Sequence, residues 1–541
     1  MSMTLRGDQG LAMGALAAGV SVVTGYPGSP VTGVFDSFLT WSKPTQAHVH
    51  WAPNEKVAME VAFGASLAGS RALVVLKSVG MNVALDPLAT MALSGCHAGL
   101  VIVLGDDPGG SASQNEQDSR WLARVAEVPL VEPVGVEQTA SLVRQAYAWS
   151  ERVGTPIIVR VTRALALAEG PVTRPRDLAP FGAGFLRERN RWVVLPARVV
   201  SAHRNLHQRL RQMAELWNAS PYDKSAGRGH IGVIAVGYTH AKLMRALGEP
   251  PPNLRIFGLA SVWPLPERTL IRWFDGVARV LVVEEGGPFV EQSVRALAQR
   301  ARLPIEILGK EDGSLPAEGE LAEADLARAL AGLDGAIRPE LGDAGDAVDR
   351  AMPSRVPLCD DCPYRPAFEA LLRAMERHGG RQSHIVIGET GCMVRANLPP
   401  MELFDVKYSL GSGLGLGMGL AASDREHRVV TLVGDSSFFH TGINAMPLAA
   451  QLDLPMLVVV LDNGTTALTG GQAHPGSSTD ERGQRRRGAN LAQLIRACGV
   501  EPLECTPDDV PAMEATLGEA LAADGMRVVI LRGPCPRYAG A

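Results

Sequence analysis

Long hydrophobic runs are missing from this sequence, although 46% of its 541 residues are hydrophobic. A membrane-spanning helix needs about 18 consecutive apolar residues, and runs such as LVIVLG at 100–105 are far shorter. The first residues also lack the charged-then-apolar pattern of a signal peptide. We therefore expect no membrane association and predict a cytoplasmic protein.

An excess of positive charge is missing as well. The sequence has 52 Lys and Arg against 57 Asp and Glu, which gives a formal net charge of −5. Binding to the phosphate backbone of a nucleic acid depends on clustered Lys and Arg. We therefore expect no nucleic-acid partner.

A true dinucleotide-binding fingerprint is the third absence. The glycines of GSGLGLGMG at 411–419 fall at every second residue, so G-x-G-x-x-G is not satisfied in any register. We expect these glycines to serve close helix-to-strand packing or approach to a cofactor, rather than nicotinamide binding.

What the sequence does contain is the alternation of an α/β protein. Residues 8–170 alternate Gly/Ala-rich helical segments with β-branched strands such as ALVVLKSVG and PIIVRVTR, which predicts a parallel sheet. A helical stretch near 195–225 ends at the helix-breaking residues Asn218-Ala219-Ser220-Pro221. A second α/β unit begins near 230. The segment 332–355 is rich in Gly, Asp and Pro, which predicts a linker. The length itself suggests about three domains.

The most informative stretch is 431–465. An apolar strand ends in Gly434-Asp435-Ser436, a helix-like segment follows, and a second strand, PMLVVVLD, ends at Asn463. Parallel strands end together at the ligand-binding edge of a sheet, and Mg²⁺ takes a few oxygen ligands from protein and others from phosphate. The pattern therefore predicts a metal-diphosphate site, with a plain Asp helix cap as the alternative.

GDSSFFHTG and the following VVVLDNGTTALTGGQAHPG closely resemble the thiamine diphosphate domain of the large α subunit of indolepyruvate:ferredoxin oxidoreductases. The resemblance runs almost from end to end of the chain. Its other matching strings are GYPGSP (25–30), NEKVAMEVAFGASLAG (54–69), KSVGMNVALDP (77–87), DDPGGSASQNEQDSR (106–120), CDDCPYRPAF (359–368), ETGC (389–392) and RGPC (532–535).

The resemblance implies an α/β fold of several parallel-sheet domains of the thiamine diphosphate-binding type, with a central α/β domain like the C-terminal domain of transketolases. The expected divisions are a pyrimidine-binding domain at 1–195, a bridging helical segment at 196–228, the central domain at 229–340, a linker at 341–355 and the diphosphate-binding domain at 356–541.

The family pattern implies residues for the thiamine diphosphate site. Asp435, Asn463 and the backbone carbonyl of Thr465 would hold Mg²⁺. Gly434, Ser436 and Thr466 would lie against the cofactor.

Three residues of the first domain are implied in catalysis. Glu55 would hydrogen-bond the aminopyrimidine ring and so activate the cofactor, unless it only complements a helix dipole. Ser29, where a Thr is more usual, would offer a hydroxyl to the 2-oxo acid. Arg120 would hold the substrate carboxylate, with a surface salt bridge as its alternative.

Four of the seven cysteines form the other chemical signal: C-x-x-C at Cys359 and Cys362, GETGC at Cys392, and a late Cys535. By themselves they suit an iron-sulfur cluster, a four-thiolate zinc site or a redox pair. The resemblance implies one 4Fe-4S cluster, because the family places its ligands in this order.

The implied activity is oxidative decarboxylation of an aryl or branched 2-oxo acid, such as indolepyruvate, to acyl-CoA and CO₂. Electrons would pass through the cluster to ferredoxin or another acceptor. A separate small subunit of the β or γ type is expected in a hetero-oligomer. The rival activities are a non-oxidative thiamine diphosphate-dependent decarboxylase or carboligase and, in a third class, a regulatory subunit.

The sequence departs from the family pattern in several places. It ends soon after Cys535, without the cysteine runs of the ferredoxin-like domain that family α subunits commonly carry, so a single cluster is expected. Ser78 and Gly471 each stand where the family usually has His, and Glu389-Thr390 stands where it usually has Asp-Ile.

Overall fold

The computed structural model describes residues 2–182, 184–248, 250–334 and 356–538. These residues form two compact units. The first holds the chain up to 334 apart from 51–54, and the second holds 51–54 and the chain from 356 onward. The predicted linker at 341–355 lies outside the described residues. Within the described ranges, no helix is both long and apolar enough to cross a membrane.

The first unit is built on a seven-stranded sheet in which β2, β4, β5 and β7 run parallel. These strands are buried on both faces, and they are accordingly rich in Val, Ile and Leu. In spatial order the strands are β12 (Ser261–Trp263), β6 (Leu130–Val131), β7 (Ile157–Thr162), β5 (Leu100–Asp106), β4 (Ala72–Lys77), β2 (Val22–Gly25) and β3 (His48–Trp51).

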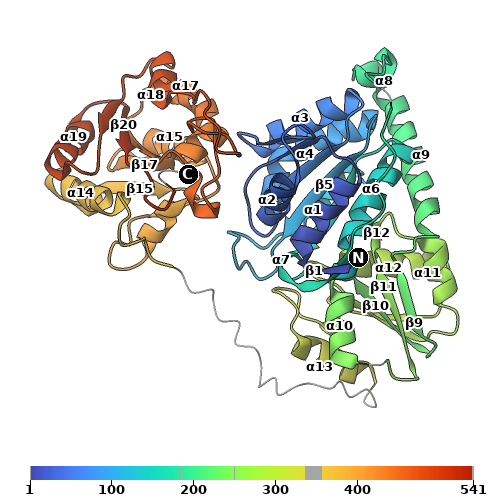
Figure 1. Ribbon diagram of the computed structural model, residues 1–541. Coiled ribbons are helices and arrows are strands. Elements are labelled where there is room, and N and C mark those ends of the chain that lie inside the picture. The colour runs from blue at the N-terminus through green and yellow to red at the C-terminus, as the bar shows by residue number, and fades with distance from the viewer. Residues whose placement is uncertain (1, 183, 249, 335–355, 539–541) are drawn as a thin grey trace. The chain divides into compact units, whose positions relative to one another are not determined.

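Helices follow these strands along the chain (Figure 1). They are α1 (Gly7–Ala17), α2 (Thr32–Trp41), α3 (Glu55–Leu67), α4 (Ser78–Ser94), α5 (Arg120–Ala126), the short turn η1 (Val136–Gln138), α6 (Thr139–Val153), α7 (Arg163–Leu167), α8 (Arg189–Trp192), η2 (Pro196–Arg198) and α9 (Val199–Trp217). A small antiparallel pair, β1 (Ser2–Arg6) with β8 (Glu169–Thr173), completes this part.

A second sheet of the same unit is formed by later residues. Its order is β14 (Glu306–Leu308), β13 (Arg279–Val283), β10 (Ile231–Val236), β11 (Leu254–Leu259) and β9 (Lys224–Gly227), of which only β9 is antiparallel to its neighbour. The helices are α10 (Thr239–Leu247), α11 (Glu267–Trp273), α12 (Phe289–Arg300) and α13 (Glu323–Leu333). Strand β12, from the segment predicted as the central domain, pairs with β6 of the first sheet.

The second unit is a parallel sheet of six strands with helices on both faces. The order is β16 (Val406–Lys407), β15 (His384–Gly388), β17 (Arg428–Gly434), β18 (Met456–Asp462), β20 (Arg527–Arg532) and β19 (Leu503–Cys505), all parallel. The remaining elements are α14 (Tyr364–Arg377), η3 (Arg381–Ser383), η4 (Cys392–Asn397), α15 (Gly413–Ser423), α16 (Asp435–Ser437), the π-helical η5 (Phe438–Gly442), α17 (Ile443–Leu452), η6 (Ala467–Thr469), α18 (Leu491–Ala497) and α19 (Val510–Ala522).

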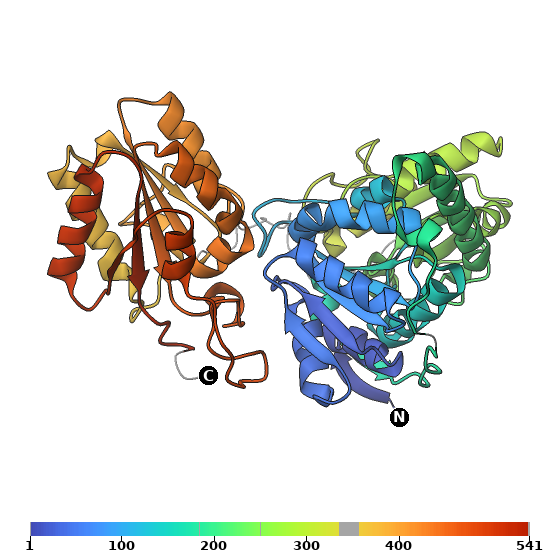
Figure 2. The ribbon, with the colours of Figure 1, turned by 90° about the horizontal axis from the view of Figure 1, so that it is seen from above.

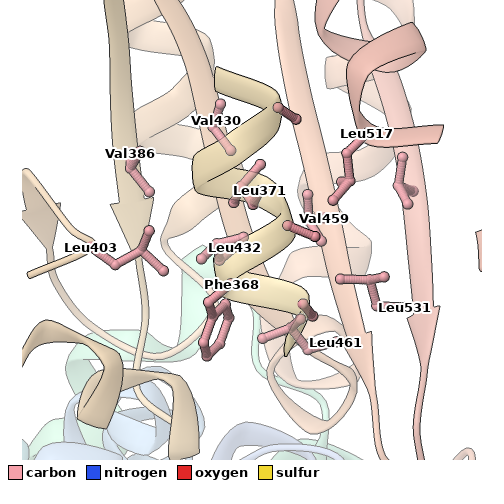
Figure 3. Packing of buried hydrophobic residues seen from close by; sticks show 14 of the residues in the cluster. Phe368, Leu371, Val386, Leu403, Val430, Leu432, Val459, Leu461, Leu517 and Leu531 are labelled. Atoms are coloured by element: carbon pink, nitrogen blue, oxygen red, sulfur yellow. The ribbon is translucent and has the colours of Figure 1, made fainter. Parts of the chain in front are cut away.

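Each face of this second sheet has its own core. Alternate residues of a strand point to opposite faces, so Val430 and Leu432 of β17 pack with α14 and α19, while Val429 and Val433 pack with α15, α17 and α18. Figure 3 shows the first core, with Phe368 and Leu371 of α14 lying over the strands. Figure 2 shows helices on both sides of the strands. The α/β prediction is confirmed for both units.

Candidate functional site

The site in the second unit begins where the strand order reverses. From β15 the chain first adds β16 on one side and then β17 on the other, and ligands of parallel sheets bind at such a switch point, beyond the carboxyl ends of the strands. Glu389 follows β15 there, Asp435 follows β17, and Asn463 follows β18. Asp435 also begins a continuous helical stretch, α16 to α17, whose first turn faces this edge.

Asp435 is the buried centre of this edge, with 3% of its surface exposed. Its Oδ2 accepts hydrogen bonds from the backbone N–H groups of Asn463 (3.0 Å) and Gly464 (2.8 Å). His474 Nε2 lies 3.1 Å from the same oxygen. The carboxylate is therefore fixed by the loop that follows β18.

The loop after β18 carries the other oxygen atoms. The side-chain Oδ1 of Asn463 accepts from the backbone N–H of Thr465 (3.0 Å), and the Thr466 hydroxyl lies 3.0 Å from the Ser436 hydroxyl. One carboxylate, one amide oxygen and nearby carbonyls are hard ligands of the kind that Mg²⁺ takes. The donor set fits a magnesium-diphosphate group.

Glu389 lies at the other side of the switch point and is fully buried. Its carboxylate accepts from the backbone N–H of Gly411 (3.2 Å) and from the N–H of Gly413 and the Ser437 hydroxyl. Burial raises the pKa of this carboxyl to about 6 despite these hydrogen bonds. Glu389 therefore ties the start of α15 to the helical stretch that begins at Asp435.

The four predicted cluster cysteines line one pocket in the same unit. Cys359 and Cys362 precede α14, Cys392 begins η4, and Cys535 follows β20. Asn463 also lines this pocket, and the backbone N–H of Cys535 donates to the carbonyl of Asn463 (3.4 Å). The cysteine pocket and the Asp435 edge are therefore adjacent.

Tyr364 lies between the two groups. It lines the cysteine pocket, only 3% of its surface is exposed, and within the described part of the chain its hydroxyl has no hydrogen-bond partner. Its pKa is raised well above the usual value, first by burial and then by the negative charges of Asp435 and Asp462. A buried hydroxyl without a partner is what a pocket built for a bound group leaves behind.

The first unit has a matching switch point between β2 and β4, because the chain goes from β2 to β3 on one side and then to β4 on the other. Ser29 lies exposed in the loop after β2. Glu55 begins α3 and is 7% exposed. Gly80 of α4 makes room for it, because a Cβ at this position would lie 2.4 Å from Glu55 Oε1.

Arg120 fits neither substrate binding nor the surface salt bridge that was its alternative. It is fully buried, and its guanidinium donates to both carboxylate oxygens of Asp118, to Glu284, and to the backbone carbonyls of Glu285 and Gly287. These bonds join the first sheet of the unit to the second. Arg120 belongs to this buried ion-pair cluster, because its charge is already matched by two carboxylates.

Two family models match the chain. Residues 389–531 match the model described as the C-terminal TPP binding domain of thiamine pyrophosphate enzymes. Residues 13–176 match the thiamine diphosphate-binding model of pyruvate flavodoxin/ferredoxin oxidoreductases.

Named relatives extend the match to nearly the whole chain. The indolepyruvate oxidoreductase subunit IorA of Archaeoglobus fulgidus is 34% identical over 98% of this chain and 86% of that protein. The subunit of the same name from Pyrococcus horikoshii is 32% identical over 99% of this chain and 86% of that protein.

The chain belongs to the indolepyruvate oxidoreductase subunit IorA family. A solved structure of a 2-oxoglutarate:ferredoxin oxidoreductase from Magnetococcus marinus superposes with a TM-score of 0.46 and 17% identity, over 57% of this chain and 62% of that chain. The family assignment rests on the sequence identity to the named relatives. Family membership and the two matched domains make the chain a thiamine diphosphate-dependent oxidoreductase subunit.

The structure shows the environment of two residues that depart from the family pattern, Ser78 and Gly471. Ser78 begins α4 and is buried. Gly471 has a φ of +83° and lies against Tyr538, since a Cβ there would be 2.5 Å from the Tyr538 ring. A side chain at 471 would therefore collide with Tyr538.

The structure brings three residues to these sites that the sequence did not predict there. They are Gly80, Tyr364 and Glu389, whose buried carboxylate accepts hydrogen bonds from backbone N–H groups. Tyr364 lies two residues after Cys362 of the C-x-x-C pair, and Glu389 follows the apolar run IVIG. Both positions carried a signal. Gly80 carried none, because only its contact with Glu55 across two helices gives it a role.

Proposed function

We propose that this chain is the thiamine diphosphate- and Mg²⁺-binding subunit of an enzyme that oxidatively decarboxylates an indolepyruvate-like 2-oxo acid, aryl or branched, to acyl-CoA and CO₂. Electrons leave through one 4Fe-4S cluster. One observation carries the proposal: four cysteines from three distant parts of the chain line a pocket that Asn463 of the diphosphate edge shares.

The diphosphate edge supports the cofactor part of the proposal. Asp435, Asn463 and the Thr465 carbonyl would hold Mg²⁺, with Gly434, Ser436 and Thr466 against the diphosphate. Bound thiamine diphosphate supplies an electron sink for cleavage of the bond between the 2-oxo carbon and the carboxylate. Three groups hold Asp435 Oδ2, so the carboxylate has a defined position at this edge.

In the first unit, Glu55 would hold a proton shared with the aminopyrimidine ring, and Ser29 would position the 2-oxo acid. The buried position of Glu55 supports this assignment, because a carboxyl group removed from water keeps a directed hydrogen bond. Gly80 is then a positioning residue that fixes where the Glu55 carboxyl lies.

The chemistry of the cysteine pocket supports a cluster. Four thiolates are the ligands of a 4Fe-4S cluster, and the four cysteines that line this pocket come in the order that the family resemblance implies. A four-thiolate zinc site uses the same number of ligands, and iron and acid-labile sulfide analysis distinguishes the two.

Cluster binding would change the protonation of the pocket. Burial raises the pKa of Cys392 to about 11 and also raises that of Cys362. Since the ligands are thiolates, assembly of the cluster would release protons. The neighbouring Arg395, whose Nη1 lies 3.9 Å from the Cys359 sulfur, would offset part of the negative charge.

The partners follow from the family. Its members carry the name of a subunit, so we infer a small partner subunit in a hetero-oligomer, with ferredoxin or that partner as electron acceptor and coenzyme A as acyl acceptor. Coenzyme A is bound in the solved 2-oxoglutarate:ferredoxin oxidoreductase; for this chain it is inferred from the reaction class alone.

The test is iron and acid-labile sulfide analysis of anaerobically purified protein, with spectra before and after thiamine diphosphate, Mg²⁺ and a panel of 2-oxo acids. We expect a cluster signal that one oxo acid bleaches. Cys535→Ala should lose acceptor reduction, whereas Cys498→Ala, which is outside the pocket, should not. Iron-free protein that still releases CO₂ would instead identify a non-oxidative decarboxylase and refute the proposal.

A further inference from the structure

Three metal-ligand side chains meet in the first unit, away from both switch points. Glu127 is the C-cap residue directly after α5, and it has a left-handed backbone with φ +55°. His203 and His207 lie one helical turn apart on α9. We call these three residues the Glu127 triad.

The side chains of the Glu127 triad point toward one another. Glu127 Oε2 lies 2.6 Å from His203 Nε2, and Glu127 Oε1 lies 3.0 Å from His207 Nε2. The two imidazole rings are 4.3 Å apart between centroids, and one ligand atom from each of the three residues lies within 4.8 Å of the other two. Two histidines four residues apart lie on the same helix face, which is how a helix presents a pair of ligands to zinc.

We propose that the Glu127 triad is a binding site for a divalent transition metal ion of the zinc type. Two imidazole nitrogens and one carboxylate oxygen are the ligand set that such ions take in three-ligand sites, with the remaining positions filled by water. The partial exposure of the triad leaves room for that water, since 46% of each histidine side chain and 29% of the Glu127 side chain are accessible.

The role of the metal is structural. Arg204 follows His203, whereas the helical H-E-x-x-H zinc sites of hydrolases have a Glu there as general base. The ion would tie α9 to the end of α5, and α5 begins with Arg120, the residue that joins the two sheets of the unit. Helix α9 also packs on α4 and α6. A bound ion would therefore hold α9 in place, and α9 is the helix that connects the two sheets along the chain.

The test is titration of the whole chain, purified anaerobically with its cysteine ligands loaded and treated with EDTA, first with Co²⁺ and then with Zn²⁺. Co²⁺ held by nitrogen and oxygen gives weak visible bands, while Co²⁺ held by thiolates gives strong near-ultraviolet charge-transfer bands. Binding at the Glu127 triad should give the first kind of spectrum at one ion per chain, measured as the difference from the same cluster-loaded chain without Co²⁺, because the cluster itself absorbs strongly, and calorimetry should count the same one ion. Zn²⁺ should displace the Co²⁺ and raise the melting temperature.

Matched variants locate the site. His203→Gln, His207→Gln and Glu127→Gln should each weaken Co²⁺ binding about tenfold or more, while His230→Gln, an exposed histidine elsewhere in the unit, should bind as the native chain does. Circular dichroism checks that the variants fold. The proposal is overturned if the native chain binds no Co²⁺ at millimolar concentration, if the triad variants bind as well as the native chain, or if only thiolate bands appear. In the first case the triad is an ordinary surface ion pair.

Discussion

Gly80 decides the position of the proposed catalytic carboxyl group. A Cβ at Gly80 would lie 2.4 Å from Oε1, 2.7 Å from Cγ and 2.9 Å from Cδ of Glu55, so any side chain at 80 must push that carboxyl group away. Misplacement of a reacting group by about 1 Å costs roughly a hundredfold in rate. We predict that Gly80→Ala lowers CO₂ release from the 2-oxo acid by about ten- to a hundredfold.

Gly64 of α3 provides the control, since no described atom beyond its own helix lies within 4 Å of a Cβ placed there. Gly64→Ala should therefore retain activity and fold at least as stably as the native chain. Equal activity of the two variants would show that the position of Glu55 does not limit the reaction.

At the level of elements, the alternate glycines of α15 have two different roles. Gly417 faces the sheet, where a Cβ would lie 2.7 Å from the Thr431 hydroxyl and 2.7 Å from the Met456 methyl. Gly415 faces open space and is exposed. The expectation of close helix-to-strand packing is confirmed for Gly413 and Gly417, because helical positions four apart share a face.

This asymmetry predicts opposite effects of the same substitution. Gly417→Ala should lower the free energy of unfolding by about 1–3 kcal/mol through overpacking, whereas Gly415→Ala should raise it by about 0.5–1 kcal/mol through helix propensity. Urea unfolding followed by circular dichroism measures both. Stabilisation by Gly417→Ala would mean that α15 does not pack this closely on β17.

At the scale of the whole molecule, the second unit has complete cores of its own. One hydrophobic cluster covers each face of its sheet. The buried residues of the first lie between 358 and 531, and those of the second lie between 387 and 530. We predict that a fragment spanning 356–541 folds alone and melts cooperatively, with an unfolding enthalpy of about 0.7 kcal/mol per residue near 60 °C. Calorimetry that found no cooperative transition would contradict the predicted domain boundary at 356.

The sequence by itself determined the α/β class and the local half of the site. Apolar strands followed by Asp435 and Asn463 are short-range patterns, and in parallel sheets their ends must share one edge. The C-x-x-C pair and the family resemblance are likewise readable along the chain, and sequence identity confirmed the family.

Only the tertiary structure decided which distant residues meet. The burial of Arg120 among carboxylates, the contact of Gly80 with Glu55, the place of Cys535 beside Asn463 and the Glu127 triad all join residues far apart in the sequence. The sequence around Arg120 is the same whether its side chain binds substrate or forms an ion pair. The charge of an arginine can be read from the sequence, but its burial and its partners depend on how other elements pack around it.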